Sequence, residues 1–237
     1  MLRSIKQLYG DHLGASDGEI GHVKDFYFDD QNWVTRYLVA DTGSWLTGRK
    51  VLLSPYSLGR LQETGKILLV NLTREQIANS PSIDAHKPVS RQYEEEYHRY
   101  FGWPYYWQGD ALWGMSGFPI LDLPPTPLPG QTPAARGPQP EATDMHLRSA
   151  QAVNGYHLAA SDGTTGHVCD FMMDDHTWGI ERLVIKTGHR FSGQEVLIPT
   201  TSVTRISYEE STVFVNLTKA AVAQSLAPPL ASVATAG

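Results

Sequence analysis

The chain is poor in cysteine, in long apolar runs and in basic charge. Cys169 is the single cysteine among 237 residues, which excludes an internal disulfide and a cysteine-based zinc cluster. The longest apolar runs are only a few residues, so no segment is long enough to span a bilayer as a helix. The formal charge of −6 argues against nonspecific nucleic-acid binding, because that binding depends on Lys and Arg neutralising phosphates.

The remaining composition is that of an ordinary globular protein. Hydrophobic residues make up 41% and charged residues 19% of the chain, which is typical of folded domains rather than disordered ones. No apolar stretch follows the positive charges of Met1 to Lys6, so a secretory signal is not visible. We therefore expect a cytoplasmic protein of one or two domains.

The chain contains an internal duplication. At an offset of 145, residues 2–83 align with residues 147–228 without a gap and with 33 identities over 82 positions. Leu2-Arg3-Ser4 returns as Leu147-Arg148-Ser149. A repeat of this length and identity predicts two copies of one small fold. We therefore predict domains at 1–83 and 147–228, an insert and linker at 84–146, and a disordered tail at 229–237.

Short strands separated by turns dominate each repeat. In the first repeat the pattern predicts strands at 12–15, 20–28, 34–41, 50–53, 58–62 and 67–72. Asp17-Gly18 lies at the centre of a hairpin turn. Thr73 and Gln76 have the spacing of a capping box, which predicts a short helix before Pro81. The fold class is mainly β, with two small β-barrels in tandem that each end in a short helix.

One irregularity predicts a β-bulge in each repeat. Val23 and Phe26 are both plausible core residues, yet strict alternation places residues three apart on opposite faces. Val168 and Phe171 repeat the conflict. An extra residue near Lys24 and Cys169 resolves it in both repeats.

Several motifs together resemble the PRC-barrel family. The resemblance lies in Asp17 to Val23, the Asp25-Phe26 pair, Arg36 to Val39, Gly48 to Leu53 and Val70 to Thr73. It covers 2–83 well and 147–228 nearly as well. The family includes the H subunit of photosynthetic reaction centres and the C-terminal domain of the ribosome maturation factor RimM. The resemblance implies a small, open barrel that serves as an interaction module.

Residues 84–146 belong to neither repeat and hold ten of the fifteen prolines. Residues 93–118 include ten aromatic residues, and residues 90–101 are predicted to form a helix with Tyr93, Tyr97 and Tyr100 on one face. Glu94 to Glu96 should lie mostly away from that face. After Leu123 a proline-rich stretch predicts an extended tether to about residue 144.

The aromatic stretch is the main candidate for a functional surface, because large rings with polar handles are typical of interfaces. The rings either pack within the chain or between copies, or dock a foreign protein, or meet a membrane interface. We expect these side chains to be the packing or partner-binding anchors: Tyr97, Trp103, Tyr105, Tyr106, Trp107 and Trp113.

Motifs that suggest catalysis or metal binding have simpler interpretations. Asp41-Thr42-Gly43 resembles an aspartic-protease signature, but Lys186 stands at the equivalent position of the second repeat, and that chemistry needs two carboxylates. If Asp17-Gly18 forms a two-residue turn, His12 and His22 point to opposite faces, which is poor ligand geometry. Asp29 and Asp30 are typical of turns. We expect no metal, no cofactor and no catalytic residue.

These observations predict a non-enzymatic interaction or scaffold module with a protein partner or self-association. By resemblance, the partner could belong to a membrane-associated electron-transfer or photosynthetic complex. The alternative is a ligand-binding protein or enzyme with a pocket between barrel and insert. A further alternative is a ribosome-assembly factor, which the acidic charge disfavours.

Overall fold

The structure is a computed structural model that describes residues 1–59, 67–81, 89–121, 147–188 and 193–225. Its contacts divide the chain into two compact units. The insert unit comprises Leu8–Ser149 with Asp175–Gly179, and the plain unit comprises Met1–Gln7, Ala150–Asp174 and Ile180–Gly237. The predicted proline-rich tether and C-terminal tail lie outside the described residues, as does most of the predicted strand at 58–62.

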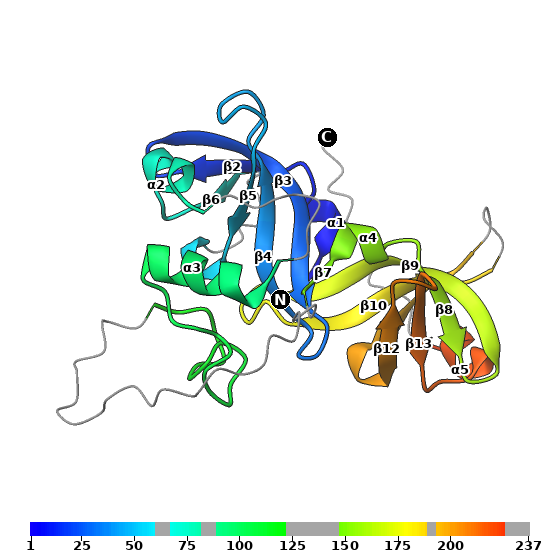
Figure 1. Cartoon of the computed structure of the whole chain (residues 1–237). Helices are drawn as coiled ribbons and strands as arrows, with labels where there is room; N and C mark the ends of the chain where they lie inside the picture. Colours follow the sequence, from blue (N-terminus) through cyan, green and yellow to red (C-terminus); the bar gives the residue numbers. More distant parts are fainter. Residues whose placement is uncertain (60–66, 82–88, 122–146, 189–192, 226–237) are drawn as a thin grey trace. The chain divides into compact units, whose positions relative to one another are not determined.

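The insert unit is built on one mixed sheet with the strand order β5-β4-β3-β2-β6, and β7 pairs with β3 off this path (Figure 1). The strands are β2 (His12–Ala15), β3 (Gly18–Asp29), β4 (Val34–Asp41), β5 (Lys50–Leu53), β6 (Ile67–Leu69) and β7 (Leu147–Ser149). The β2–β6 pair is parallel, while the other pairs are antiparallel. Leu13, Phe26 and Leu38 are fully buried in its core.

The plain unit repeats this order at the same offset of 145. Its sheet runs β11-β10-β9-β8-β13-β12, with β1 paired to β9. The strands are β1 (Leu2–Ser4), β8 (His157–Ala160), β9 (Gly163–Asp174), β10 (Ile180–Lys186), β11 (Glu195–Pro199), β12 (Val203–Ser207) and β13 (Thr212–Val215). The predicted duplication and the mainly β class are confirmed. Within the described residues both sheets have unpaired outer strands, so each is an open mixed sheet rather than a closed barrel.

The helices also occupy matching positions. The repeats contain α1 (Ile5–Leu8) and α4 (Ala150–Val153), η1 (Pro55–Ser57) and η2 (Thr200–Ser202), and α2 (Arg74–Ala78) and α5 (Lys219–Ala223). Thr73 and Gln76 form the predicted capping box on α2, and Thr218 caps α5. The insert contributes α3 (Arg91–Phe101), which matches the predicted helix.

Both predicted bulges are present. Between β3 and β4, Val23 faces Ala40 and Asp25 faces Val39, so Lys24 is the extra residue. Between β9 and β10, Val168 and Asp170 face Ile185 and Val184, so Cys169 is the extra residue. The bulge places both Val23 and Phe26 in the core, at 1% and 0% exposure, which strict alternation would prevent.

The repeats exchange their first strands, and the sequence pattern alone does not predict this arrangement. Leu2–Ser4 begin the first repeat but pair with Met172–Asp174 of the plain unit. Leu147–Ser149 begin the second repeat but pair with Tyr27–Asp29 of the insert unit. The compact units therefore differ from the expected boundaries 1–83 and 147–228, because residues 1–7 contact the second repeat.

The bulge aspartates hold the exchanged strands. Ser149 donates a hydrogen bond from its hydroxyl to Asp25 Oδ2 at 2.5 Å, and Ser4 donates in the same way to Asp170 Oδ2. The other oxygen of each aspartate accepts the amide of the following phenylalanine at 2.7 Å. Each carboxylate thus joins the bulge of one repeat to the first strand of the other.

Replacing Ser4 by alanine should destabilise the plain unit, although Ser4 belongs to the first repeat. Loss of a hydrogen bond to a charged acceptor costs about 1.5–3 kcal/mol. Cys169 lies in the plain unit, whereas all six tryptophans lie in the insert unit. We therefore expect faster alkylation of Cys169 in Ser4→Ala, with an unchanged denaturation midpoint by tryptophan emission.

Ser149→Ala is the matched control and should destabilise the insert unit instead of the plain unit. Its hydroxyl binds Asp25 in the insert unit, so the tryptophan midpoint should fall and Cys169 reactivity should stay constant. If Ser4→Ala lowers only the tryptophan midpoint, the assignment of the first strands is wrong.

Candidate functional site

The aromatic insert packs on the sheet of the first repeat within the insert unit. Helix α3 starts at its N-cap Ser90, whose hydroxyl accepts the amide of Tyr93 at 3.2 Å. It ends at Gly102, which adopts a left-handed conformation with φ 69°. Pro104 follows, as expected for a helix that cannot continue. The chain then folds back so that the Leu112 carbonyl accepts a hydrogen bond from Arg36 of β4 and the Trp113 carbonyl accepts one from Tyr56.

The rings of the insert interlock with two tyrosines of the first repeat. Tyr97 donates its hydroxyl to the Leu52 carbonyl and meets the Tyr37 ring edge-on at 5.7 Å. Tyr56 meets Trp113 edge-on at 5.2 Å. Trp113 also donates its indole N–H to the Thr177 carbonyl at 2.8 Å. These contacts fix the insert on the β4 and β5 side of the sheet (Figure 1).

The structure places the six predicted anchors in two groups. Tyr97, Trp103, Tyr106 and Trp113 are buried, with exposures of 0%, 7%, 5% and 2%. Tyr105 and Trp107 are half-buried. The rings of Tyr105 and Trp107 lie 4.8 Å apart. Most of the aromatic surface is thus used inside the unit, and Trp107 faces a pocket.

A buried carboxylate lies at the centre of the site. Glu94 is 2% exposed, and its Oε1 accepts hydroxyl hydrogen bonds from Tyr37 at 2.9 Å and Tyr106 at 2.6 Å. Its Oε2 is paired with Arg91 at 3.1 Å. Burial raises the pKa of Glu94, although Arg91 and the two phenols oppose the shift. The prediction that Glu94 lies away from the packed face is wrong, because it precedes Tyr97 by three residues and shares that face.

A buried histidine extends this network. His98 is fully buried; its Nδ1 lies 2.9 Å from the Pro104 carbonyl, and its Nε2 lies 3.1 Å from the Tyr37 hydroxyl. Desolvation lowers the pKa of His98 to about 4, so the ring is neutral near pH 7. A carbonyl can only accept, so Nδ1 carries the proton. Tyr37 then has one hydrogen for two acceptors, His98 and Glu94.

A buried arginine occupies the other side of the site. Arg36 is 2% exposed and pairs with Asp29 at 3.1 Å, and it also donates to the Leu112 carbonyl. Its guanidinium lies 3.9 Å from the Tyr106 ring centroid, a cation–π contact. Asp29 in turn accepts the Gln31 and Asn32 amides at 2.9 and 3.2 Å, which confirms its predicted role in a turn.

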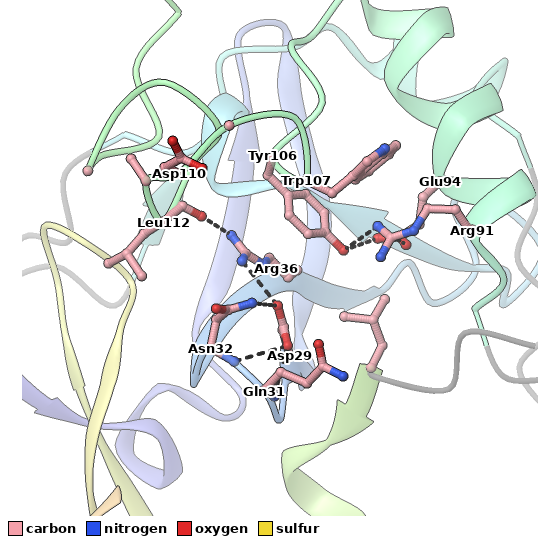
Figure 2. Close-up of a pocket in the computed structure, with 14 residues that line it drawn as sticks. Asp29, Gln31, Asn32, Arg36, Arg91, Glu94, Tyr106, Trp107, Asp110 and Leu112 are labelled. Atoms are coloured by element: carbon pink, nitrogen blue, oxygen red, sulfur yellow. Dashed lines mark hydrogen bonds and ion pairs between the residues drawn. The ribbon is translucent and has the colours of Figure 1, made fainter. Parts of the chain in front are cut away.

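These groups form the wall of a pocket of about 490 Å³. Figure 2 shows Arg36 between Asp29 and Leu112, and the Tyr106 hydroxyl directed toward Arg91 and Glu94. The remaining lining comes from the Gln31–Asn32 turn, Trp107, the 109–112 loop, Gly117 and Leu147. The pocket therefore offers charges of both signs beside an aromatic face, which suits a polar molecule better than an apolar one.

The second repeat does not carry this site. At the offset of 145, Arg36 and Tyr37 correspond to Glu181 and Arg182, and Tyr56 corresponds to Thr201. Glu181 and Thr201 are exposed in the plain unit. The two repeats therefore share a framework, but only the first has the side chains that receive the insert.

The expected arrangement of the paired histidines is wrong. The hairpin places Ala15 opposite Gly18, so the loop is Ser16-Asp17, and a register shift brings His12 opposite His22. Directly opposed residues share one face of a sheet. His12 Nδ1 lies 2.7 Å from Glu19. No group of three or more potential metal ligands occurs among the described residues.

The remaining motifs behave as structural elements. The carboxylate of Asp41 accepts the Gly43 amide at 3.0 Å, so the Asp-Thr-Gly sequence forms a turn after β4. Cys169 is half-buried, and burial raises the pKa of its thiol to about 11. In the described part of the chain, no helix is long and apolar enough to cross a membrane.

Comparison with known proteins gives one distant relative. No family model matches the chain. An uncharacterized protein of Deinococcus radiodurans is 28% identical over 99 residues. The match covers 36% of this chain and 35% of the relative, so the chain spans about a third of the protein that it resembles.

Acidification should destabilise the insert unit through His98. A histidine whose pKa falls from 6.5 to about 4 on folding stabilises the fold above pH 6.5, and this stability is lost as the pH falls toward 4. Between pH 7 and pH 5 the loss is about 2 kcal/mol. His98→Gln should therefore show a weaker loss of stability over this range, measured by urea denaturation with tryptophan emission.

Glu94 provides the opposite control. Its raised pKa contributes stability at low pH that is lost as the pH rises through the folded value. Glu94→Gln removes this contribution, so its loss of stability between pH 7 and pH 5 should be at least as large as that of the wild type. Equal pH profiles for wild type and His98→Gln would contradict a neutral buried imidazole.

Proposed function

We propose that the protein is a non-enzymatic assembly module that binds by adding a strand to the edge of its long strands β3 and β9. The observation that carries this proposal is the exchange itself, because each long strand takes a first strand that belongs to the other repeat. Addition of a strand at a sheet edge is a common mode of protein recognition. Backbone hydrogen bonds supply affinity in this mode, and flanking side chains supply specificity.

The edge of β3 supports selective binding. Its Asp25 binds the hydroxyl of Ser149, and Asp30, just beyond the strand, pairs with Arg148 Nε at 2.5 Å. Arg148 and Asp30 are both mostly buried, at 18% and 14% side-chain exposure. Charge-assisted hydrogen bonds of this kind discriminate more strongly than neutral ones. A Leu-Arg-Ser strand is therefore the chemistry that this edge recognises.

In this proposal each of the two repeats is a PRC-barrel domain. The matching strand orders, the paired bulges and the terminal capped helices support that assignment. The resemblance extends the proposal to a protein partner in a membrane-associated electron-transfer complex. A ribosome-assembly role is less favoured, since the chain carries a charge of −6 and binding to RNA phosphates depends on basic side chains.

Disulfide trapping tests the strand addition. In a Cys169→Ala background, Leu2→Cys with Asp174→Cys joins two residues that face each other across β1 and β9. Opposed residues of an antiparallel pair have Cα atoms about 4.5–5.5 Å apart, which suits a disulfide. We expect this variant to lose both free thiols on mild oxidation while remaining a monomer.

The matched control keeps the same acceptor. Leu147→Cys with Asp174→Cys would close only if the second repeat kept its own first strand, because Leu147 faces Asp29 in the structure. Closure of this control, with an open Leu2/Asp174 variant, would refute strand exchange and the proposed binding mode together.

Binding of a small polar molecule is a second candidate function, and the mixed-charge pocket of about 490 Å³ favours it. Native mass spectrometry of gently purified protein should then show a small-molecule adduct. Trp107→Ala removes a pocket wall and should lose the adduct, whereas Trp45→Ala, outside the pocket lining, should keep it. An unliganded mass, or an adduct retained by Trp107→Ala, would contradict this candidate.

A further inference from the structure

We infer that the edge of β9 also accepts the first strand of a second copy of this chain, which produces a closed, strand-exchanged dimer. This inference rests on the proposed function and names its partner. In the dimer, residues 1–7 of each copy would complete the plain unit of the other copy. Because each copy gives one strand and receives one, the contact is symmetric and stops at two chains.

The first strands and the edges that receive them are both duplicated in this chain. Leu2-Arg3-Ser4 and Leu147-Arg148-Ser149 have the same sequence, and the edges keep an aspartate at 25 and 170 and an acidic pair at 29–30 and 174–175. Serine binds the bulge aspartate in both units. An edge that accepts this strand from another repeat accepts the identical strand from another copy through the same contacts.

The first strand itself is short, although contacts at its ends add to it: the N-terminal ammonium group pairs with Asp174 at 3.1 Å, and Ile5 just beyond the strand is fully buried. β1 contributes three paired residues, Leu2 to Ser4. The two further hydrogen bonds to Asp170 come from the Ser4 hydroxyl and the Lys6 amide, the latter at 2.9 Å. Release of residues 1–7 therefore breaks this short ladder and uncovers Ile5, while the other buried residues of the plain unit lie between Ala150 and Val222.

Mass action decides which copy supplies the strand. A covalently attached strand acts at an effective concentration in the millimolar range, so a folded chain in dilute solution keeps its own β1. During refolding every copy has an empty edge and an unpaired first strand. At high protein concentration a second copy then competes, and because the exchanged product has the same contacts as the monomer, its share is set by the protein concentration during refolding.

Co-refolding of two single-cysteine variants tests the inference. Leu2→Cys and Asp174→Cys, both in a Cys169→Ala background, are mixed, unfolded, refolded and oxidised. We expect a disulfide-linked heterodimer that is under about a tenth of the product at 1 µM and approaches about a quarter near 1 mM, because about half of the chains then dimerise and random pairing makes half of the dimers heterodimers. Each variant refolded alone should give no Leu2–Asp174 link, as shown by peptide mass mapping.

Two further measurements separate the possible failures. If the mixture remains monomeric at every concentration, while the Leu2/Asp174 double variant closes its internal disulfide, the dimer is refuted and the proposed function stands. If the double variant also stays open, the strand exchange itself is refuted. Sedimentation velocity of the unmodified protein, refolded at both concentrations, controls for a folding defect caused by the substitution at residue 174. If the wild-type protein refolded at 1 mM is a monomer, the inference is overturned.

Discussion

The hydrogen bond between a serine of one repeat and a bulge aspartate of the other is the interaction on which the architecture depends. The bulge at Lys24 lets Val23 and Phe26 enter the same core, and Asp25 follows the extra residue. Asp25 is 8% exposed, and a buried carboxylate needs charge-compensating hydrogen bonds. The Phe26 amide and the Ser149 hydroxyl supply two of them. Core packing and strand exchange are thus two consequences of one local distortion.

Duplication produced two equal frameworks, and the insert made them unequal. The insert buries Glu94 and His98 away from solvent. There, a neutral polar group without a hydrogen-bond partner would cost about 1–3 kcal/mol, and an unpaired ion would cost more. Two residues of the first repeat provide these partners. Tyr37 donates a hydrogen bond to Glu94. Arg36 pairs with Asp29 and covers the Tyr106 ring. Arg182 and Glu181 could not do the same, which explains why the insert packs on the first repeat.

Features that depend on local sequence were predictable, and features that depend on distant pairing were not. Strands β4 and β5, the capping box at Thr73, helix α3 and both bulges follow from periodicity, caps and turns. The strand exchange could not be predicted, because the two Leu-Arg-Ser segments are identical and the sequence does not show which sheet edge each of them occupies. The register of His12 failed through a bulge beside Gly14 that moves the pairing by one residue. The burial of Glu94 could have been inferred from its helical spacing with Tyr97 and His98, had the glutamates not been assigned together to the solvent face.

The exchange also links the order of synthesis to the order of folding. β3 can pair with β2 and β4 as soon as the first repeat exists, since all three lie within residues 12–41. Its remaining edge waits for Leu147–Ser149, and Leu2–Ser4 wait for Met172–Asp174. Such long-range pairings form late, because loop closure must precede the contacts that reward it. An exposed strand edge invites wrong partners, and the first strand of the same repeat is the nearest competitor. In the final structure each first strand lies on the other repeat, so neither repeat reaches its final sheet without the other.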